Sequence, residues 1–161
     1  MLTIKRGKGS VSILGFVGIL VLVIIVLRVP AVAGPKEDVA AATQAWVDAF
    51  GSRNPDQVVA LYDAEAVLWG TVEQKIRDNP PAISDYFKLL SNLTQAKVVV
   101  GEQRIRVYGD TAINTGYYTF TLERDGQPRT FPARFSFTYL KRDGRWMIVD
   151  HHSSVLPQPP R

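Results

Sequence analysis

The chain after Gly34 begins with apolar positions at helical spacing. Across residues 36–52 the apolar side chains recur every three or four positions, the period that gathers them on one face of a helix. Asn54-Pro55-Asp56 follows, with a capping residue, a proline suited to the first helical position and an acidic residue in the first turn. The pattern therefore predicts an amphipathic helix over 36–52 and a short second helix over 55–62.

A short strand and a third helix follow. Residues 66–70, with the sequence AVLWG, predict a strand, and residues 71–79 form a polar stretch without clear periodicity. Pro80-Pro81 then opens a segment whose apolar residues share one stripe, which predicts a helix to about Leu93. The first part of the domain is therefore predicted to be mainly helical.

From Ala96 onward the pattern changes to long strands. Turn signals interrupt it at Gly109-Asp110, Asp125-Gly126 and Asp143-Gly144. Four strands are predicted, at 97–108, 112–123, 129–141 and 145–156. Because tight hairpins join antiparallel neighbours, these strands form a meander. Helices first and strands afterwards favour an α+β fold, in which about three helices pack on one face of a curled sheet.

The first 33 residues differ from the rest. Residues 11–27 are uncharged and rich in Val, Ile and Leu, and Lys5, Arg6 and Lys8 precede them. A bilayer span needs about 17 to 25 such residues and a signal-peptide core about 7 to 15. We therefore expect residues 1–33 to form a hydrophobic helix that is either a single-pass membrane anchor or a signal peptide cleaved near Ala33. Positive charge before the span predicts that the following domain lies outside the cytoplasmic membrane. The domain is membrane-bound if the anchor is retained, and secreted or periplasmic if it is cleaved.

The positive charge of the chain belongs to this leader. Of 19 Lys and Arg residues four precede Gly34, whereas all 15 acidic residues follow it, so the remainder carries 15 charges of each sign. A neutral domain lacks the electrostatic basis for binding phosphate backbones, and no nucleic-acid partner is expected. The chain has no cysteine, which excludes disulfides and thiolate chemistry. Gly-rich phosphate loops and metalloprotease motifs are also missing from the sequence, so no cofactor is expected.

The sequence Asp150-His151-His152-Ser153-Ser154 holds the residue types of catalytic triads and metal sites. On a strand, successive side chains alternate between faces, so His151 and Ser153 point one way while the other three point the opposite way. Neighbours in this run cannot form a Ser-His-Asp relay with one another. Two histidines on opposite faces also fall short of the three or four ligands that zinc needs, so no metal site is expected.

Individual side chains are candidates for contact with a ligand. His151 or His152 suits a general base or a hydrogen-bond donor, and the hydroxyl of Tyr118 suits a donor. The alternative is structural, because buried polar groups usually just hydrogen-bond neighbouring parts of the protein. Arg134 is a charge in an otherwise apolar strand and needs an anion, an acidic partner or solvent. The predicted ligand-contact set is Trp69, Tyr86, Tyr118, Arg134, His151 and Ser153. Core packing is the alternative for the aromatic members.

Five motifs together resemble one protein family. They are VALYDAEAVLWGT (59–71), AISDYF (82–87), GDTAINTGYYTF (109–120), ARFSFTY (133–139) and DGRWMIVDHHSSVLP (143–157). In order and spacing they resemble bacterial relatives of the association, or hub, domain of calcium/calmodulin-dependent protein kinase II, in the nuclear transport factor 2-like superfamily. The resemblance covers about residues 36–157, so the domain is expected over 34–157 with a short tail at 158–161.

The resemblance implies a cone in which a curved sheet wraps helices around a central pocket. The hub is an oligomerisation module whose pocket binds small carboxylates through arginines. The resemblance also implies that His151 and Ser153 face inward, unless a bulge reverses their direction. This chain departs from the hub where an arginine is replaced by Ser153 and where the strand arginine aligns with Phe137. No kinase domain accompanies it.

Two functions compete. The first is a non-catalytic extracytoplasmic domain that binds a small organic ligand, assembles as a homodimer or larger homo-oligomer, or does both. The alternative is an isomerase, cyclase or dehydratase in which a pocket histidine is the general base. Related folds carry many functions, so the fold itself does not decide between the two.

Overall fold

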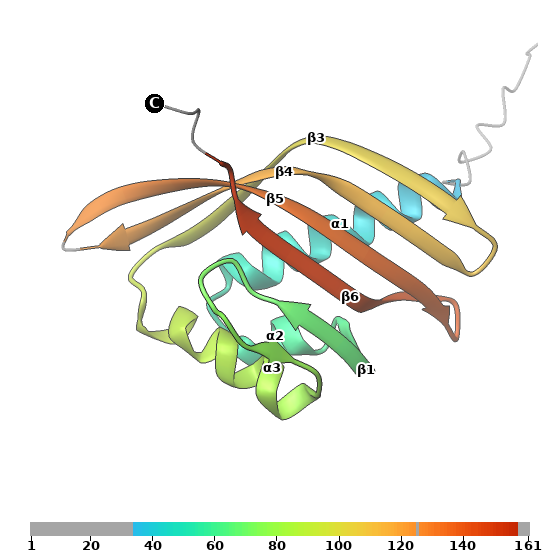
Figure 1. The fold of residues 1–161 in the computed structure, drawn as a ribbon, viewed down its shortest axis with the longest axis horizontal. Helices are drawn as coiled ribbons and strands as arrows, with labels where there is room; N and C mark the ends of the chain where they lie inside the picture. Colours follow the sequence, from blue (N-terminus) through green and yellow to red (C-terminus); the bar gives the residue numbers. More distant parts are fainter. Residues whose placement is uncertain (1–33, 125, 158–161) are drawn as a thin grey trace, which may run out of the picture. The chain divides into compact units, whose positions relative to one another are not determined.

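The computed structural model describes residues 34–124 and 126–157 (Figure 1). The predicted anchor or signal peptide at 1–33 and the tail at 158–161 lie outside these residues. The described elements, in chain order, are α1 (Pro35–Gly51), α2 (Pro55–Val59), β1 (Tyr62–Trp69), β2 (Ile76–Arg77), α3 (Pro80–Phe87), the 3-10 helix η1 (Lys88–Asn92), β3 (Ala96–Tyr108), β4 (Thr111–Arg124), β5 (Gln127–Arg142) and β6 (Arg145–Val155).

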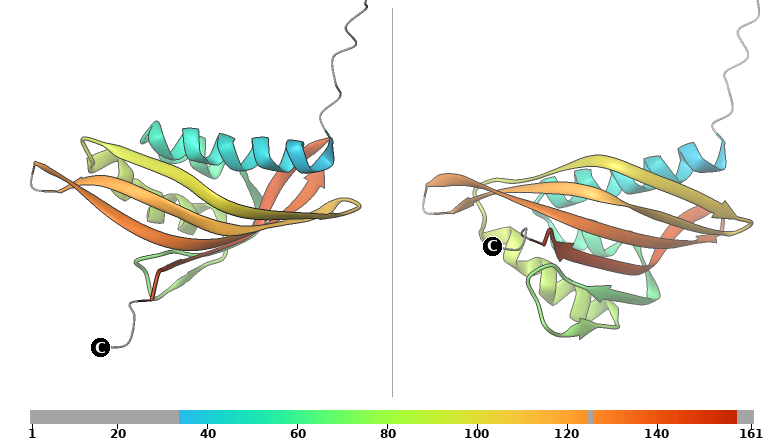
Figure 2. Two further views of the ribbon diagram at one scale, coloured as in Figure 1. Left: turned by 90° about the horizontal axis from the view of Figure 1, so that it is seen from above. Right: turned by 45° about the horizontal axis from the view of Figure 1, so that its top comes forward.

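The strands form one curved sheet in the order β2-β1-β6-β5-β4-β3. Strands β3 to β6 are an antiparallel meander, as predicted, whereas β1 lies parallel to β6 with Tyr62 opposite Ile148 and Trp69 opposite His152. Helix α1 runs across one face of the sheet, here called the inner face (Figure 2). The predicted α+β class with helices on one face of a curled sheet is confirmed.

Local signals fix the helix starts, and the ends differ from prediction. The side chain of Asn54 accepts the backbone N–H of Asp56 at 3.0 Å, and Asn79 caps α3 in the same way. Helix α2 is shorter than the predicted 55–62, because Tyr62 already belongs to β1. The predicted helix over 80–93 is α3 followed by the 3-10 turn η1, and the stretch expected to be irregular contains the short strand β2.

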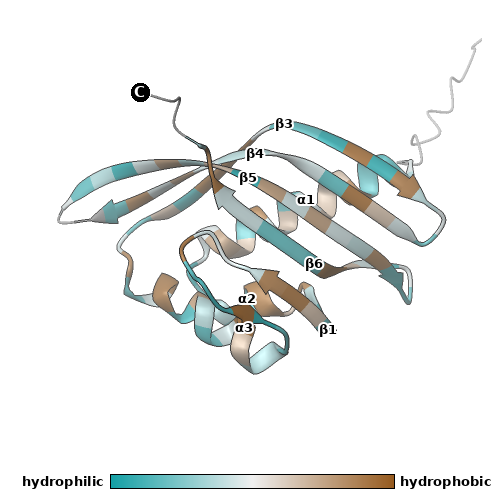
Figure 3. Ribbon diagram, in the orientation of Figure 1, coloured by the Kyte–Doolittle hydropathy of each residue, from teal (hydrophilic) through white to brown (hydrophobic). Residues whose placement is uncertain are grey.

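The core lies between the helices and the inner face of the sheet. Aromatic rings dominate it, and the brown segments in Figure 3 mark the apolar positions of the strands and of α1. Trp46 is 1% exposed and Trp146 9%, as expected for core residues. None of the helices that the structure describes is long and apolar enough to cross a membrane, and the predicted span at 11–27 is not among the described residues.

A bulge in β6 decides which polar residues face the core. The pairing of β5 with β6 shifts between Thr138 and Tyr139, so that Asp150 lies opposite Thr138, Ile148 lies opposite Tyr139, and Val149 is the extra residue. Trp146 and Ile148 are buried on one side of the bulge, and His151 and Ser153 on the other. Without the extra residue, strict alternation from Ile148 would have turned His152 inward instead.

Candidate functional site

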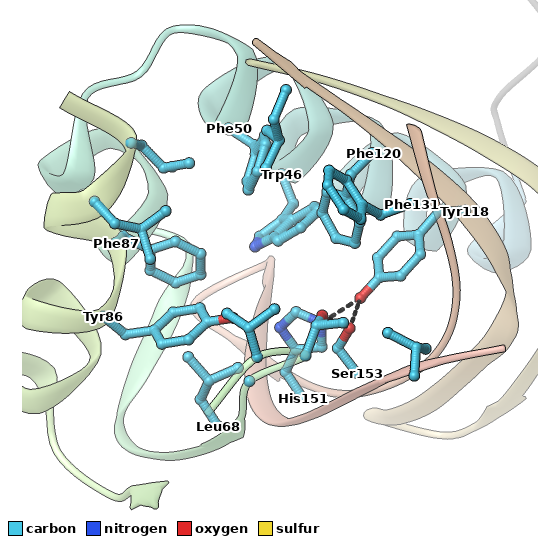
Figure 4. A pocket seen from close by; sticks show the side chains of 17 residues that line it. Trp46, Phe50, Leu68, Tyr86, Phe87, Tyr118, Phe120, Phe131, His151 and Ser153 are labelled. Atoms are coloured by element: carbon cyan, nitrogen blue, oxygen red, sulfur yellow. Dashed lines mark hydrogen bonds between the residues drawn. The ribbon is translucent and has the colours of Figure 1, made fainter. Parts of the chain in front are cut away.

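A pocket lies between α1, the α3–η1 segment and the inner face of the sheet (Figure 4). Its volume is about 120 Å³. The lining residues are mostly aromatic or aliphatic, and the polar ones collect at the end formed by β6 and the start of the β1–β2 loop, at His151, Ser153 and Thr71. The pocket is therefore an apolar cavity with one polar end.

Hydrogen bonds assign the tautomer of His151. The hydroxyl oxygen of Tyr62 accepts the indole N–H of Trp46 at 3.1 Å, and it lies 2.7 Å from Nδ1 of His151. The single hydroxyl hydrogen of Tyr62 is satisfied when it is donated to Nδ1. Nδ1 is then an acceptor, and a neutral imidazole carries its hydrogen on Nε2. This nitrogen faces the hydroxyl of Tyr118 at 3.4 Å.

The surroundings of His151 keep the imidazole uncharged. Its ring stacks on Phe137 with 4.1 Å between centroids and meets Trp46 edge-on at 5.2 Å. Burial, and to a lesser extent the neighbouring His152, lower the pKa of His151 to about 3. At neutral pH the ring is therefore uncharged, with Nδ1 occupied, and it offers the pocket a hydrogen-bond donor rather than a base.

Three hydroxyl groups continue the polar end beyond His151. Tyr118 donates to Ser153 Oγ at 2.5 Å, and Ser153 Oγ shares a further hydrogen bond with Thr71 Oγ1. Tyr118 is 2% exposed and Ser153 5%. Burial raises the pKa of the Tyr118 phenol above its usual value, so this group also stays neutral. The cluster is thus a set of uncharged donors that are bonded mainly to one another.

Tyr86 closes against the pocket over Gly70. A Cβ at Gly70 would lie 2.3 Å from Cε2 of Tyr86 and 2.7 Å from its hydroxyl oxygen, so only glycine leaves room for the ring here. Burial raises the pKa of Tyr86, while hydrogen bonds from the backbone of Val72 and Thr71 act in the opposite direction. Gly70 therefore holds the shape of the pocket by leaving space for Tyr86.

We expect Gly70→Ala to destabilise the domain by about 1–3 kcal/mol, because the new methyl group overlaps the ring of Tyr86. Urea unfolding of single and double variants measures this. In the Tyr86→Ala background the overlap is gone, so Gly70→Ala should cost far less there. An equal cost in both backgrounds would show that the effect comes from the backbone of residue 70 and not from Tyr86.

The structure gathers some of the predicted site residues and separates others. His151, Ser153, Tyr118 and Tyr86 line the same pocket. Trp69 does not, since it is 48% exposed and Leu68 takes the inward position on β1. Trp69 therefore lies apart from the four residues that line this pocket.

Arg134 and His152 lie on the outer face of the sheet, opposite the helices. Both side chains are exposed, and they share a shallow groove with Tyr117 and Glu102. In the pairing of β5 with β6, Arg134 lies opposite Ser154, and Ser136 lies opposite His152. The residues between them in each strand point inward. Arg134 and His152 therefore lie apart from the pocket, on the opposite face of the sheet.

The sequence did not single out Trp46, Tyr62 and Thr71 as site residues. Trp46 was expected only in the core, Tyr62 at the end of a helix and Thr71 in an irregular stretch. Their roles depend on contacts between elements far apart in the chain, such as the bond from Tyr62 to His151. A local signal could have found Tyr62 alone. Had the strand been predicted to begin at Tyr62 instead of Ala66, alternation would have placed the Tyr62 side chain on the inner face.

The pocket's composition limits the chemistry that it can perform. None of its lining residues in the described part of the chain is Asp, Glu, Lys or Arg. Within residues 34–124 and 126–157, moreover, no three His, Asp or Glu side chains gather in a way that would hold a metal ion. The site therefore presents apolar surface and neutral donors.

Solved structures place this fold in the nuclear transport factor 2-like class. A protein from Streptomyces avermitilis named as a dehydratase of the NTF2-like family is 16% identical, with a TM-score of 0.70 over 76% of this chain and 96% of that one. A protein from Novosphingobium aromaticivorans named as an aromatic ring hydroxylase is 19% identical, with a TM-score of 0.69 over 78% and 94%. At these identities the likeness shows the fold alone.

The family follows from residues 35–157, which match the model of the calcium/calmodulin dependent protein kinase II association domain. A solved structure described as such an association domain, from Xanthomonas campestris, is 36% identical, with a TM-score of 0.74 over 83% of this chain and 95% of that one. The chain belongs to the calcium/calmodulin dependent protein kinase II association domain family. A search of curated protein sequences found no match.

Proposed function

We propose that this protein is a non-catalytic domain that binds a small organic ligand in the pocket and assembles with further copies of itself. The observation that carries the first part is an apolar cavity whose few polar groups meet at one end. Binding sites for small molecules commonly combine apolar walls with a few placed polar groups. A filled core would not leave about 120 Å³ beside a cluster of hydroxyl groups.

An isomerase, cyclase or dehydratase is the second candidate. It is favoured by the contact of His151 Nε2 with Tyr118 at the pocket, which pairs a histidine with a tyrosine donor. A general base must accept a proton from the substrate, however, and Nε2 already carries a hydrogen in the tautomer set by Tyr62. The hydrogen bonds of His151 therefore support binding over proton abstraction.

Assembly is supported by the family and by the outer face of the sheet. The family is named for association, and strands β3 and β4 carry the exposed apolar side chains of Val99 and Tyr117 on that face. Val99 is 52% exposed and Tyr117 47%. Broad sheet surfaces with exposed aromatic residues are typical of subunit contacts. A homodimer or larger homo-oligomer that covers this face is the assembly proposed.

The location proposed is outside the cytoplasmic membrane. The positively charged start of the chain and the apolar run at 11–27 support it. Residues 1–33 serve either as a retained single-pass anchor or as a signal peptide removed near Ala33. The domain lies on the same side of the membrane in both cases.

One experiment addresses ligand, assembly and leader together. We expect native mass spectrometry of the full-length gene product, purified from its own cells in a lipid or detergent environment, to show at least a dimer with one small organic molecule retained per subunit. The subunit mass distinguishes a retained leader from a chain that starts at Gly34. A monomer would contradict assembly, and subunits without any retained molecule, which also fail to take one up from a cell extract, would contradict ligand binding.

A further inference from the structure

The pocket has no charge to offer a charged ligand. Its lining within the described residues contains no ionised side chain at neutral pH, since His151 and Tyr118 are both held neutral by burial. Phe137, fully buried, stacks on His151 and adds a further apolar group behind the polar end. Moving a carboxylate into such a site without a counter-charge is strongly unfavourable.

The size of the pocket matches a ligand group of about one ring. Its volume is about 120 Å³. An engineered apolar cavity of similar volume, about 150 Å³, in another protein binds benzene, so a single six-membered ring suits this pocket. Aromatic walls at Trp46, Phe87 and Tyr118 suit a flat ring, because offset and edge-to-face contacts between rings are favourable (Figure 4).

The polar end holds one weakly bonded donor hydrogen, that of His151 Nε2. His151 Nε2, Tyr118, Ser153 and Thr71 bring four donor hydrogens, and three hydrogen bonds join these four groups in the described structure. The weakest of these bonds is the one from Nε2–H to Tyr118, at 3.4 Å, near the limit for a hydrogen bond. An acceptor atom placed in the cavity beside His151 would improve on it.

We propose that the pocket binds a neutral compound of about one ring that carries an acceptor oxygen, such as an aryl ketone, and that this oxygen takes the hydrogen of His151 Nε2 while the corresponding carboxylate is rejected. The inference rests on the proposed ligand-binding function and narrows it to a chemical class. Tyr62 and Trp46 are positioning residues in this arrangement. They hold Nδ1 as an acceptor and so keep the donor hydrogen on the nitrogen that faces the cavity.

Three matched probes test the ligand class: toluene, acetophenone and benzoate. The full chain, labelled with ¹⁵N in its histidine and tryptophan rings and held in lipid nanodiscs, is titrated with each at pH 7. The ring resonances of His151 and Trp46 report binding, so partition of a probe into lipid does not register. We expect acetophenone to bind roughly 3- to 10-fold more tightly than toluene, the value of one hydrogen bond. Benzoate should bind at least about 10-fold more weakly than acetophenone.

A pair of variants tests the role of His151. His151→Leu should remove the preference for acetophenone over toluene, whereas His152→Leu, the same change on the outer face, should keep it. The Trp46 indole resonance follows binding in both variants. If His151→Leu does not fold, the wild-type titration still decides, because acetophenone but not toluene should shift the Nε2–H resonance of His151.

The possible failures are distinguishable. Benzoate binding as tightly as acetophenone would overturn the neutral ligand class and leave the pocket as a binding site. Equal binding of toluene and acetophenone, with the Nε2–H resonance unmoved, would overturn the role of His151 alone. Binding of none of the three probes would overturn this inference, whereas the proposed function fails only if the native protein also retains no molecule and takes none up from a cell extract.

Discussion

Replacing Trp46 by alanine is expected to lower the free energy of unfolding by about 3–5 kcal/mol, the range for large aromatic residues removed from a core. Trp46 is 1% exposed, and its ring contacts Phe137 and His151 at centroid distances of 5.4 and 5.2 Å. The variant also removes the N–H donated to Tyr62. A typical domain has about 5–15 kcal/mol of stability, so this single change removes a large share. Urea unfolding measures it as a lower midpoint at constant slope.

Trp69→Ala is the matched control. The same residue type is lost from β1, but the side chain is 48% exposed and does not line the pocket. Substitutions at such surface positions usually change stability by about 0.5 kcal/mol or less, so Trp69→Ala should cost far less than Trp46→Ala. An equal loss of unfolding free energy in Trp69→Ala and Trp46→Ala would contradict the assignment of Trp46 to the centre of the core.

Acid is expected to destabilise the domain through His151. The loss of stability should begin at a pH well above the range in which ordinary carboxylates titrate. The unfolded chain binds a proton at His151 near the usual pKa of about 6.5, whereas burial lowers the pKa of the folded form to about 3. The stabilising effect of the neutral ring is therefore fully present above about pH 6.5 and is lost as the pH falls toward 3. The expected slope in that window approaches about 1.4 kcal/mol per pH unit, the value for one proton.

Urea unfolding between pH 7 and 5, compared among variants, measures this slope. His151→Gln should flatten it, since glutamine takes up no proton, whereas His152→Gln retains the buried imidazole and should keep it. Asp150 acts in the opposite direction, because burial raises the pKa of its carboxyl group and folding then favours proton uptake. A slope that survives in His151→Gln would mean that another group causes the acid sensitivity.

The order of elements could be predicted because its signals are local. Turn sequences such as Asp143-Gly144 mark the hairpins, and both residues there have positive φ, at 50° and 80°. Asn54 and Asn79 cap the helices that were expected to start beside them. Boundaries that depend on packing were missed. Tyr62 was predicted to end a helix, but it begins β1, because its ring packs in the core beside His151.

The site could be predicted only in part, because its geometry depends on the bulge at Val149. Alternation correctly separates His151 from His152, and the resemblance implied which of them turns inward. The bulge reverses the alternation that Trp146 and Ile148 would otherwise impose, and nothing in the local sequence marks it. Trp69 and Arg134 were assigned to the pocket on residue type, and only the register of β1 and β5 shows that they lie elsewhere.

The state of the His151 ring is measured most directly by ¹⁵N NMR of the full chain, which contains only two histidines. A neutral binding pocket requires that this ring keep one protonated nitrogen, Nε2, and one unprotonated nitrogen, Nδ1, from pH 8 down to pH 5. His151→Gln identifies the resonances of the ring by their loss. A His151 that carries its hydrogen on Nδ1, or that becomes doubly protonated near pH 6, would contradict the donor role and restore the general base of the enzymatic alternative.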